Sequence, residues 1–388
     1  MISDSLKGRC CSLKIMLAGG GTAGHINPAI AIAKYIRKRR PSAEIVFIGA
    51  TNGMENKLVP DAGFELRTFP MSGMMRGFSA KAFRHNLKTA KLLAKAMKSA
   101  DQIIDEFQPD IIIGTGGFAC FPPLYRGAKR GIPTVIHESN VLPGRTNRLL
   151  SRYVDQVLLG FEDGKNYFKH AKNIRFTGNP LREGMIFTKK ADAKRALGIE
   201  GPLVYSAFGS LGARAMNELT AELFALEEAD HAAFRHIHST GSFGYQWMPE
   251  RVASLGVDLA ASGRIDMREY VYDAPAVLAA SDLMVCRAGS MTMSELCATG
   301  TPSILIPSPN VTEHHQHKNA HALADRGAAV MLEEEGLTAQ TLYDTICGLL
   351  NDEARLAEMS RAALSLAVFD AEEQIYRCVM ELTGGKPE

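Results

Sequence analysis

The 388-residue sequence predicts an α/β protein that is built from two Rossmann-like domains. Short apolar segments alternate with amphipathic segments along the chain, and this alternation is typical of parallel β/α units. The pattern begins twice, and each half opens with an apolar strand that leads into a glycine-rich turn. The length supports two domains, because a chain of this size exceeds one ordinary hydrophobic core. Ligands of such sheets bind beyond the carboxyl ends of the strands, so we expect the functional residues in the loops there.

The first half contains five predicted strands and two predicted helices. The strands are expected at residues 14–18, 44–48, 110–114, 133–137 and 155–159, and the helices at residues 27–40 and 79–107. A loop rich in turn residues, TGNPLR (177–182), ends this half, and a charged stretch at residues 189–195 marks the boundary region.

The second half repeats the pattern. Its strands are expected at residues 203–208, 234–239, 268–271, 283–286 and 303–307, and its helices include residues 213–226 and 353–382. The last helix is expected to break near Phe369 and Asp370. No internal repeat appears, so the two halves share a pattern of elements and not a repeated sequence.

The composition argues against several classes of protein. Hydrophobic residues make up 46% and charged residues 22% of the chain, and the net charge of +2 indicates no nucleic-acid partner. Seven cysteines without CxxC spacing indicate reduced thiols in a cytosolic protein. The first residues lack the apolar stretch of a signal peptide, and no apolar run reaches the ~18–20 residues that span a bilayer. We expect a protein that is neither exported nor integral to a membrane.

Three glycine-rich loops follow predicted strands, at residues 19–25 (GGGTAGH), 114–118 (GTGGF) and 208–213 (FGSLGA). Glycine lets backbone N–H groups converge on an anion, and a following helix adds a favourable dipole. An NAD site is not favoured, because the first loop lacks the GxGxxG spacing and no acidic residue ends the second strand. Three such loops predict a site that binds more than one phosphate group.

A further segment, CRAGSMTMSE (286–295), leads from a strand through a turn into a helix. The amides of residues 290–294 lie near the start of that helix, where they can meet a diphosphate. Glu295 follows about one turn later, where a carboxylate could accept two ribose hydroxyls. Taken alone, Glu295 is also compatible with a solvated surface glutamate. The strand–glycine–helix context and the stop at Gly300-Thr301-Pro302 favour the ligand role.

His314, His317 and His321 would share one face of a helix, so zinc binding has to be considered. No carboxylate or cysteine elsewhere is visibly paired with them. The sequence favours instead a polar helix start that presents Gln316 to a ligand.

Residues 71–88 (MSGMMRGFSAKAFRHNLK) interleave apolar and basic side chains. This pattern fits a surface that dips into an anionic membrane, and it also fits an amphipathic helix that packs on the core. The candidate membrane residues are Met74, Met75, Arg76, Phe78, Lys81, Phe83 and Arg84.

These motifs together resemble the MurG family, the undecaprenyldiphospho-muramoylpentapeptide β-N-acetylglucosaminyltransferases of bacterial peptidoglycan synthesis. The resemblance covers nearly the whole chain, and the order and spacing of its motifs are specific. It rests on GGGTAGHINPA (19–29), GTGGF (114–118), HESN and PGRTNR (137–148), TGNPLR (177–182), FGSLGAR (208–214), CRAGSMTMSE (286–295) and HHQHKNA (314–320). The family's first loop usually reads GGTGGH, and Ala23 here replaces a glycine, so we expect a negative φ at this residue.

The resemblance implies a GT-B fold, in which two Rossmann-like domains face a cleft. Residues 1–182 would form the acceptor- and membrane-facing domain, residues 183–365 the UDP-sugar domain, and residues 366–388 a helix that returns to the first domain. The implied reaction is the inverting transfer of N-acetylglucosamine from UDP-N-acetylglucosamine to the 4-hydroxyl of the muramoyl sugar of lipid I, which gives lipid II. The implied location is the cytoplasmic face of the cell membrane, with peripheral attachment to an anionic surface.

The resemblance also implies roles for individual residues. His25 is the candidate base, because imidazole titrates near neutrality, although it could instead donate a hydrogen bond to an acceptor phosphate; Glu138 is the second candidate base. No D-x-D pair is present, so we expect no metal cofactor, and amides would carry the diphosphate charge. The implied acceptor-binding residues are Gly24, His25, Gly116, Gly117 and Asn140. The implied donor-binding residues are Thr22, Ala23, Gly24, Asn140, Arg182, Ser210, Val271, Ser290, Met291, Thr292, Met293, Ser294, Glu295 and Gln316.

Three other functions remain open at this point. A related glycosyltransferase could act on diacylglycerol or another polyprenyl lipid, although the GGGTAGH and HESN motifs argue against it. A UDP-sugar 2-epimerase would use a similar two-domain site without a lipid. A catalytically silent protein would bind the nucleotide sugar and not turn it over.

Overall fold

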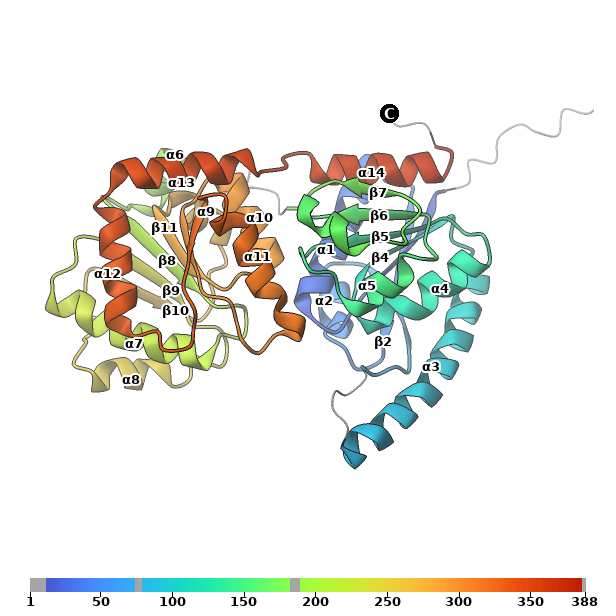
Figure 1. Ribbon diagram of the computed structural model, residues 1–388, viewed down its shortest axis with the longest axis horizontal. Coiled ribbons are helices and arrows are strands. Elements are labelled where there is room, and N and C mark those ends of the chain that lie inside the picture. Colours follow the sequence, from blue (N-terminus) through green and yellow to red (C-terminus); the bar gives the residue numbers. More distant parts are fainter. Residues whose placement is uncertain (1–11, 74–78, 182–188, 386–388) are drawn as a thin grey trace, which may run out of the picture. The chain divides into compact units, whose positions relative to one another are not determined.

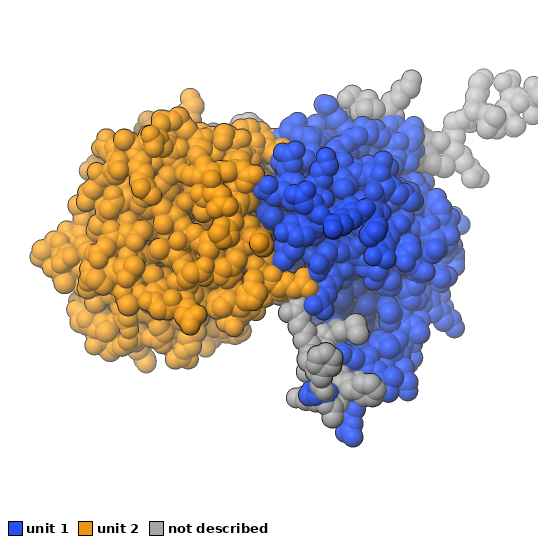
Figure 2. All heavy atoms as spheres, in the orientation of Figure 1, with its two compact units in different colours: residues 1–180, 370–388 blue, residues 181–369 orange. Residues whose placement is uncertain are grey.

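The computed structural model describes residues 12–73, 79–181 and 189–385. The chain forms two compact units, which Figure 2 shows in different colours. The N-terminal unit comprises residues 1–180 together with residues 370–388, and the C-terminal unit comprises residues 181–369. The sequence suggested domain limits at residues 182 and 365.

A seven-stranded sheet forms the centre of the N-terminal unit within the described residues, with all neighbouring strands parallel. Its strand order is β3-β2-β1-β4-β5-β6-β7, so the order reverses between β1 and β4, where ligands of such sheets bind. The strands are β1 (Lys14–Gly19), β2 (Glu44–Ala50), β3 (Glu65–Phe69), β4 (Ile111–Gly116), β5 (Thr134–Glu138), β6 (Gln156–Leu159) and β7 (Ile174–Phe176). The helices are α1 (Ala23–Arg39), α2 (Glu55–Asp61), α3 (Ala80–Phe107), α4 (Phe121–Lys129), α5 (Arg145–Leu150) and α14 (Ala371–Leu382), with short 3-10 turns η1 (Phe118–Cys120) and η2 (Glu162–Tyr167) (Figure 1).

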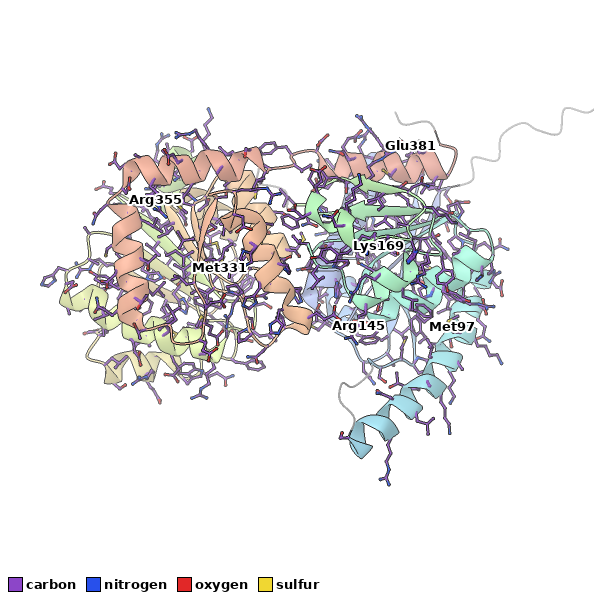
Figure 3. The ribbon with its side chains drawn as sticks, in the orientation of Figure 1. Met97, Arg145, Lys169, Met331, Arg355 and Glu381 are labelled. Atoms are coloured by element: carbon purple, nitrogen blue, oxygen red, sulfur yellow. The ribbon has the colours of Figure 1, made fainter. Side chains whose placement is uncertain are left out.

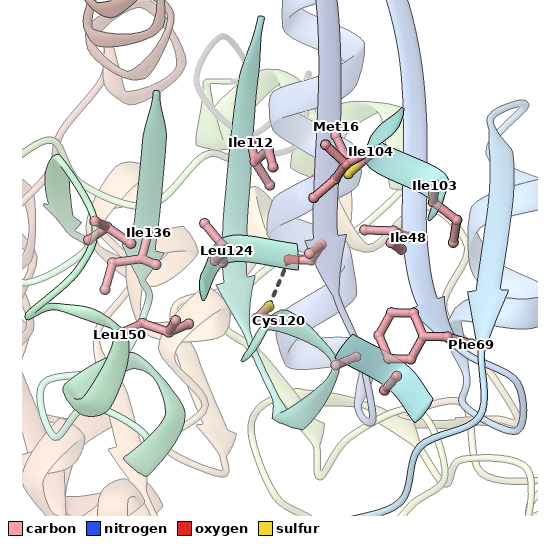
Figure 4. Close-up of a cluster of buried hydrophobic side chains, with 14 of the residues drawn as sticks. Met16, Ile48, Phe69, Ile103, Ile104, Ile112, Cys120, Leu124, Ile136 and Leu150 are labelled. Atoms are coloured by element: carbon pink, nitrogen blue, oxygen red, sulfur yellow. Dashed lines mark hydrogen bonds between the residues drawn. The ribbon is translucent and has the colours of Figure 1, made fainter. Parts of the chain in front are cut away.

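Both faces of this sheet are covered, which explains the nearly continuous apolar runs of its central strands. Alternate residues of a strand point to opposite faces. Met16 of β1 therefore joins the core cluster that contains Ile112 and Leu124 (Figure 4), whereas Leu17 joins a second cluster with Ile32 of α1.

The last helix, α14, packs against α1 of the N-terminal unit. Tyr376 of α14 is fully buried, and its hydroxyl accepts a hydrogen bond from Arg40 Nε at 3.1 Å. Tyr35 Oη donates to Glu373 Oε2 at 2.8 Å, and Arg39 forms an ion pair with the same carboxylate. The expected return of the C-terminal helix to the first domain is thereby confirmed.

The C-terminal unit is built in the same way around a six-stranded parallel sheet within the described residues, with the order β10-β9-β8-β11-β12-β13. Here the order reverses between β8 and β11. The strands are β8 (Leu203–Ala207), β9 (Arg235–Ser239), β10 (Ile265–Arg268), β11 (Leu283–Cys286), β12 (Ser303–Leu305) and β13 (Ala329–Met331). The helices are α6 (Lys190–Leu197), α7 (Arg214–Ala229), α8 (Met248–Ser254), α9 (Ala274–Ala280), α10 (Ser290–Thr299), α11 (His315–Ala324), α12 (Ala339–Leu350) and α13 (Glu353–Ser365), with the 3-10 turn η3 (Thr312–His314).

The predicted fold class of two Rossmann-like α/β domains is confirmed, and several predicted elements need correction. β3, β7 and β13 were not predicted, and the strand expected at residues 268–271 lies at Ile265–Arg268 instead. β10 pairs with β9 from Ile265 to Arg268, whereas the apolar Val271 that suggested a strand is buried in the loop after it. The helix expected from residue 27 begins at Ala23.

Among residues 12–73, 79–181 and 189–385, no helix is long and apolar enough to cross a bilayer.

Candidate active site

The first and second glycine-rich loops pack directly against each other at the switch point of the N-terminal sheet. Gly20 N donates to Gly116 O at 3.3 Å, beside a register shift between β1 and β4. Gly117 has a φ of +83°, and a side chain there would overlap the carbonyl oxygen of Gly20. Glycine is therefore required at residue 117 by both its backbone conformation and the space around it.

The first loop ends in the N-terminus of α1. Thr22 is the exposed, extended residue before the helix, and its carbonyl accepts from His25 N at 3.0 Å. Ala23 is the first helical residue and is not among the described residues with positive φ, so the expected negative φ at this replaced glycine is confirmed. The first N–H groups of a helix have no intrahelical acceptor, so those of Ala23 and Gly24 are suited to an anion.

His25 is half-buried, and residues of the second loop set its position. Thr115 Oγ1 donates to the carbonyl oxygen of His25 at 2.6 Å. The imidazole lies against Gly116, where an added Cβ would come within 2.6 Å of Nδ1. Gly116 also has a φ of +113°, so glycine is needed there for both reasons.

Glu138 lies at the end of β5 and is only 1% exposed. Its Oε1 accepts from Asn140 N at 2.9 Å and from Asn140 Nδ2 at 3.1 Å. Its Oε2 accepts from Gly144 N at 3.1 Å and from Asn147 Nδ2 at 2.8 Å. A general base must reach the proton that it removes. This burial, with four donors around the carboxylate, argues against the expected base role and makes Glu138 the group that shapes the following loop.

The loop after β5 is also tied to the loop after β7. His137 Nε2 makes a hydrogen bond with Gly178 O at 3.0 Å, and Asn179 Nδ2 donates to Ser139 O at 3.1 Å. Burial lowers the pKa of His137, so it stays a neutral structural group at ordinary pH. Asn140 stays half-buried at the edge of this assembly, and Arg182, which was expected to line the site, lies outside the described residues.

In the C-terminal unit, the loop after β8 pairs with the loop after β9. Ser242 N donates to Ser210 O at 3.3 Å, and Gly212 would overlap Thr240 O if it carried a side chain. Buried Asn217 of α7 donates to Thr240 O at 2.8 Å and so anchors the second loop. Ser210 itself is exposed.

The predicted turn into a helix at residues 286–295 is present as β11 followed by α10. Gly289 caps the helix in an extended conformation, and Gly300 ends it with a φ of +62°. Glu295 is only 8% exposed, which excludes the alternative of a solvated glutamate. Met293 is fully buried, so only its amide could contribute to binding.

Side chains from neighbouring loops hold the start of α10. Asn319 Nδ2 donates to Ala288 O at 3.0 Å, and Arg287 Nη1 donates to Ile306 O at 3.1 Å. Arg287 also forms an ion pair with Glu334 at 2.6 Å. The remaining residues of the first turn that were expected to bind the donor are Ser290, which is buried, and the half-buried Met291, Thr292 and Ser294.

Two further expected donor residues belong to the same unit: Gln316 lies in the first turn of α11, and Val271 lies in the loop after β10. Gln316 Oε1 accepts from Ser308 N at 2.8 Å, so the amide nitrogen of Gln316 points away from this backbone N–H group. Val271 is buried just after β10.

The structure does not gather the three histidines into a metal site. His317 pairs with Glu333 at 2.9 Å and His321 with Asp325 at 3.1 Å. No cluster of three or more His, Cys, Asp or Glu side chains suited to a metal ion occurs in the part of the chain that the structure describes.

Two family models together match most of the chain. The model of the glycosyltransferase family 28 N-terminal domain matches residues 15–159, and the model of the family's C-terminal domain matches residues 204–375. The chain belongs to glycosyltransferase family 28. The predicted family and the predicted glycosyltransferase class are thereby confirmed.

Curated family 28 relatives match over nearly the full length. A relative from Acetivibrio thermocellus is 41% identical over 376 residues, which are 96% of this chain and 99% of the relative. A relative from Ruminiclostridium cellulolyticum is 42% identical over 372 residues, which are 95% of this chain and 100% of the relative. Both are named UDP-N-acetylglucosamine–N-acetylmuramyl-(pentapeptide) pyrophosphoryl-undecaprenol N-acetylglucosamine transferase.

Solved structures share the family 28 fold. The crystal structure of Acinetobacter baumannii MurG aligns with a TM-score of 0.73 at 26% identity and covers 95% of this chain and 99% of that chain. The UDP complex of S. aureus MnaA aligns with a TM-score of 0.65 at 13% identity and covers 97% and 99% of the two chains. At this lower identity the likeness shows the fold alone.

Two residues that support the candidate site were not predicted from the sequence. Thr115 lies within the second glycine-rich loop and Asn217 shortly after the third, and both are buried. They donate to the carbonyl oxygens of His25 and Thr240. The sequence offers only a weak signal for these roles, namely a polar residue in or near a glycine-rich motif. The carbonyl oxygens that accept from Thr115 and Asn217 are 90 and 23 residues away in the sequence.

Proposed function

We propose that this protein catalyses the inverting transfer of N-acetylglucosamine from UDP-N-acetylglucosamine to lipid I, the muramoylpentapeptide linked to undecaprenyl diphosphate. The product is lipid II, the disaccharide-carrying precursor of peptidoglycan. The near-full-length match to relatives named for this transfer carries the proposal. The glycine-rich loops at strand ends of both units support it, because donor and acceptor each carry a diphosphate.

We assign the donor to the C-terminal unit. The first amides of α10, from Ser290 to Ser294, would bind the diphosphate at the positive end of the helix dipole. Glu295 would accept the ribose hydroxyls, and the amide nitrogen of Gln316 would reach the sugar. Ser210 would contact the phosphates from the loop after β8, and the backbone of Val271 would meet uracil.

We assign the acceptor to the N-terminal unit. The N–H groups at the start of α1 would meet the acceptor diphosphate, and His25 would take the proton of the attacking hydroxyl. In this step the 4-hydroxyl oxygen bonds to C1 of N-acetylglucosamine, the bond from C1 to the diphosphate breaks, and its electron pair leaves with UDP. The imidazole must be neutral to accept the proton, and such a base contributes about 10²–10⁴-fold to the rate.

We propose that no metal ion is required for this step. Backbone amides and the α10 dipole would stabilise the leaving diphosphate. Full loss of turnover on chelation, with recovery on adding a divalent ion, would contradict this part of the proposal.

We propose that α3 attaches the protein to an anionic membrane. Arg84, Lys91, Lys95 and Lys98 are exposed, and helical spacing puts them on one face together with Leu87, which is 55% exposed. The opposite face packs into the core through Ala96, Ala100 and Ile104. The alternatives that the sequence left open concern residues 71–88, and α3 continues beyond them; its side chains near Met97 appear in Figure 3.

Met74, Met75, Arg76 and Phe78 lie outside the described residues, as do the side chains of Lys81 and Phe83.

The decisive experiment is turnover of UDP-N-acetylglucosamine with a soluble lipid I analogue, followed by mass spectrometry. Release of UDP with an acceptor that is heavier by one N-acetylglucosamine residue is the expected result. Conversion of the donor into its 2-epimer without acceptor would identify an epimerase. UDP binding without turnover would identify a silent binding protein, and transfer to diacylglycerol in place of the lipid I analogue would identify another glycolipid transferase.

A further inference from the structure

A buried carboxyl group lies directly behind the first glycine-rich loop. Glu55, the first residue of α2, is 0% exposed. Its Oε2 accepts from Gly21 N at 3.1 Å, and its Oε1 accepts from Ala50 N at 2.9 Å. Both oxygens therefore act as acceptors, the arrangement that an ionised carboxylate favours. A ligand cannot touch this group, because no part of it reaches solvent.

Three glycines make room for this carboxyl group. A Cβ added to Gly20 would come within 2.6 Å of Glu55 Oε1, and one added to Gly49 would come within 2.7 Å of Glu55 Cγ. A Cβ added to Gly53 would overlap the carboxyl group itself. None of the three is among the described glycines with positive φ, so backbone conformation does not require glycine at these positions. Glycine is required there because the side chain of Glu55 occupies the space that a Cβ would take.

The hydrogen bond from Gly21 determines the shape of the loop that follows. Gly21 has a φ of +87°, and its N–H is committed to Glu55. The backbone then enters α1, whose first amides at Ala23 and Gly24 remain suited to an anion. Glu55 thus holds the residue at which the chain turns from β1 into the anion-binding helix start.

We propose that Glu55 is a positioning residue for the lipid-linked acceptor. It fixes the Gly19–His25 loop, so that the first amides of α1 and the His25 imidazole keep the geometry that the acceptor diphosphate and its attacking hydroxyl require. This inference rests on the proposed function. A negative charge behind a diphosphate site is itself unfavourable for binding, so the two effects of Glu55, its geometry and its charge, have opposite signs and can be separated.

The test compares Glu55→Gln with Gly53→Ala. Glu55→Gln keeps the size of the side chain and removes its charge. Gly21 N and Ala50 N donate to different oxygens of Glu55, and in glutamine one of these oxygens is replaced by an NH₂ group, which cannot accept. Gly53→Ala keeps the charge and displaces the carboxyl group. If Glu55 acts by positioning, both variants raise the acceptor KM or lower kcat, by about 10- to 100-fold for the loss of a hydrogen bond to a charged group. If its charge dominated, Glu55→Gln would lower the acceptor KM and Gly53→Ala would leave it unchanged, and the proposal would be overturned.

Two further measurements separate positioning from general instability. We assign UDP to the C-terminal unit, whereas both variants alter the N-terminal unit. The affinity for UDP should therefore stay within about twofold of wild type, a change of only ~0.4 kcal/mol. Hydrogen exchange of the Gly21 amide should be slow in the wild type and fast in both variants. Glu106→Gln, at an exposed carboxylate of the same unit, and Gly348→Ala, where a Cβ meets open space, are the matched controls.

The outcomes also distinguish this inference from the proposed function. A wild-type protein that makes no product with the lipid I analogue contradicts the proposed function. An active wild type whose variants keep the acceptor KM, kcat and Gly21 protection contradicts only the role of Glu55. If Glu55→Gln does not fold, Gly53→Ala and the exchange of Gly21 still decide the question.

Discussion

The imidazole of His25 lies so close to the α-carbon of Gly116 that a methyl group there would come within 2.6 Å of Nδ1. The neighbouring Thr115 donates to the carbonyl oxygen of His25, although the two residues are 90 positions apart in the sequence. The second glycine-rich loop therefore orients the proposed base of the first loop.

Gly116→Ala should impair the chemical step more than substrate binding. The added methyl group would displace the imidazole, and the φ of +113° would be strained for alanine. We expect kcat to fall by about 10²–10⁴-fold, the usual contribution of a positioned base. UDP affinity should not change. Steady-state kinetics against the Gly348→Ala control would test this, and a kcat within threefold of wild type would contradict it.

Glu138→Gln should affect stability and leave the pH profile of the rate in place. Each carboxylate oxygen of Glu138 accepts two hydrogen bonds, and the substitution replaces one of these oxygens by an NH₂ group, which is a donor. We therefore expect the free energy of unfolding to fall by about 1–3 kcal/mol. The acidic limb of the pH–rate profile should persist in this variant and disappear in His25→Gln. Loss of that limb in Glu138→Gln alone would return the base role to Glu138.

The stability of the C-terminal unit should fall in acid because of a buried histidine. Ser206 Oγ bridges His236 Nε2 and His238 Nδ1 at 2.7 Å each, and His236 Nδ1 contacts Glu227 Oε1 at 2.7 Å. Burial, together with the neighbouring His236, lowers the pKa of His238 to about 3. Below its ordinary pKa of about 6.5, the unfolded chain binds a proton that the folded protein does not, so stability is complete above that pH and decreases as the pH falls.

This effect amounts to at most about 1.4 kcal/mol per pH unit from one group, between the unfolded and the folded pKa. Denaturant unfolding at pH 5 and pH 7, followed by the fluorescence of Trp247, the one tryptophan of the sequence, would measure it. His238→Gln should reduce the difference between the two pH values, and the exposed His170→Gln should not. Equal stability of the wild type at both pH values would rule the effect out.

Gly212→Ala should weaken donor binding. A side chain at this position would overlap Thr240 O and separate the loop after β8 from the loop after β9. We expect UDP affinity to fall at least tenfold, a change of about 1.4 kcal/mol. Gly256→Ala is the matched control, because its φ of +83° is equally strained while nothing lies within 4 Å of its Cβ. Similar UDP affinities in both variants, measured by calorimetry, would contradict the role of the paired loops.

Membrane attachment should depend on the basic face of α3. Changing Lys91, Lys95 and Lys98 together to Gln removes about 1 kcal/mol of attraction per residue near an anionic surface. We expect vesicle binding at low salt to fall by about 100-fold on phosphatidylglycerol-containing membranes. The control changes three exposed lysines elsewhere, Lys57, Lys165 and Lys169. Equal binding by the two triple variants would exclude α3 as the attachment surface.

The central strands were predictable from the sequence, whereas the edge strands were not. β11 lies at the predicted residues 283–286, and β1, β2 and β8 end within two residues of their predicted limits. The strands that were missed or misplaced, β3, β7, β10 and β13, are the four outer strands of the two sheets. These outer strands are only partly buried, so their apolar signal is weak.

The candidate site was predictable only where its signals are local. Glycine-rich turns and helix starts lie within a few residues of one another, so the loops around Thr22, Ser210 and Ser290 could be selected directly. The roles of Glu55 and Glu138 could not be predicted in this way, because they depend on burial and on which amides approach each carboxyl group.

The amino-acid sequence alone determined the family, the two-domain α/β class and the loops that carry the proposed chemistry. Apolar periodicity, glycine turns and helix starts are properties of short segments, so they can be recognised without knowledge of the fold. The packed chain alone reveals that Glu138 is enclosed by four donors, that Glu295 is buried and that Glu55 supports the first loop. Glu55 and its donor Gly21 are 34 residues apart, whereas all four donors to Glu138 lie within nine residues of it. In each case water is excluded from the polar group only once the chain has packed.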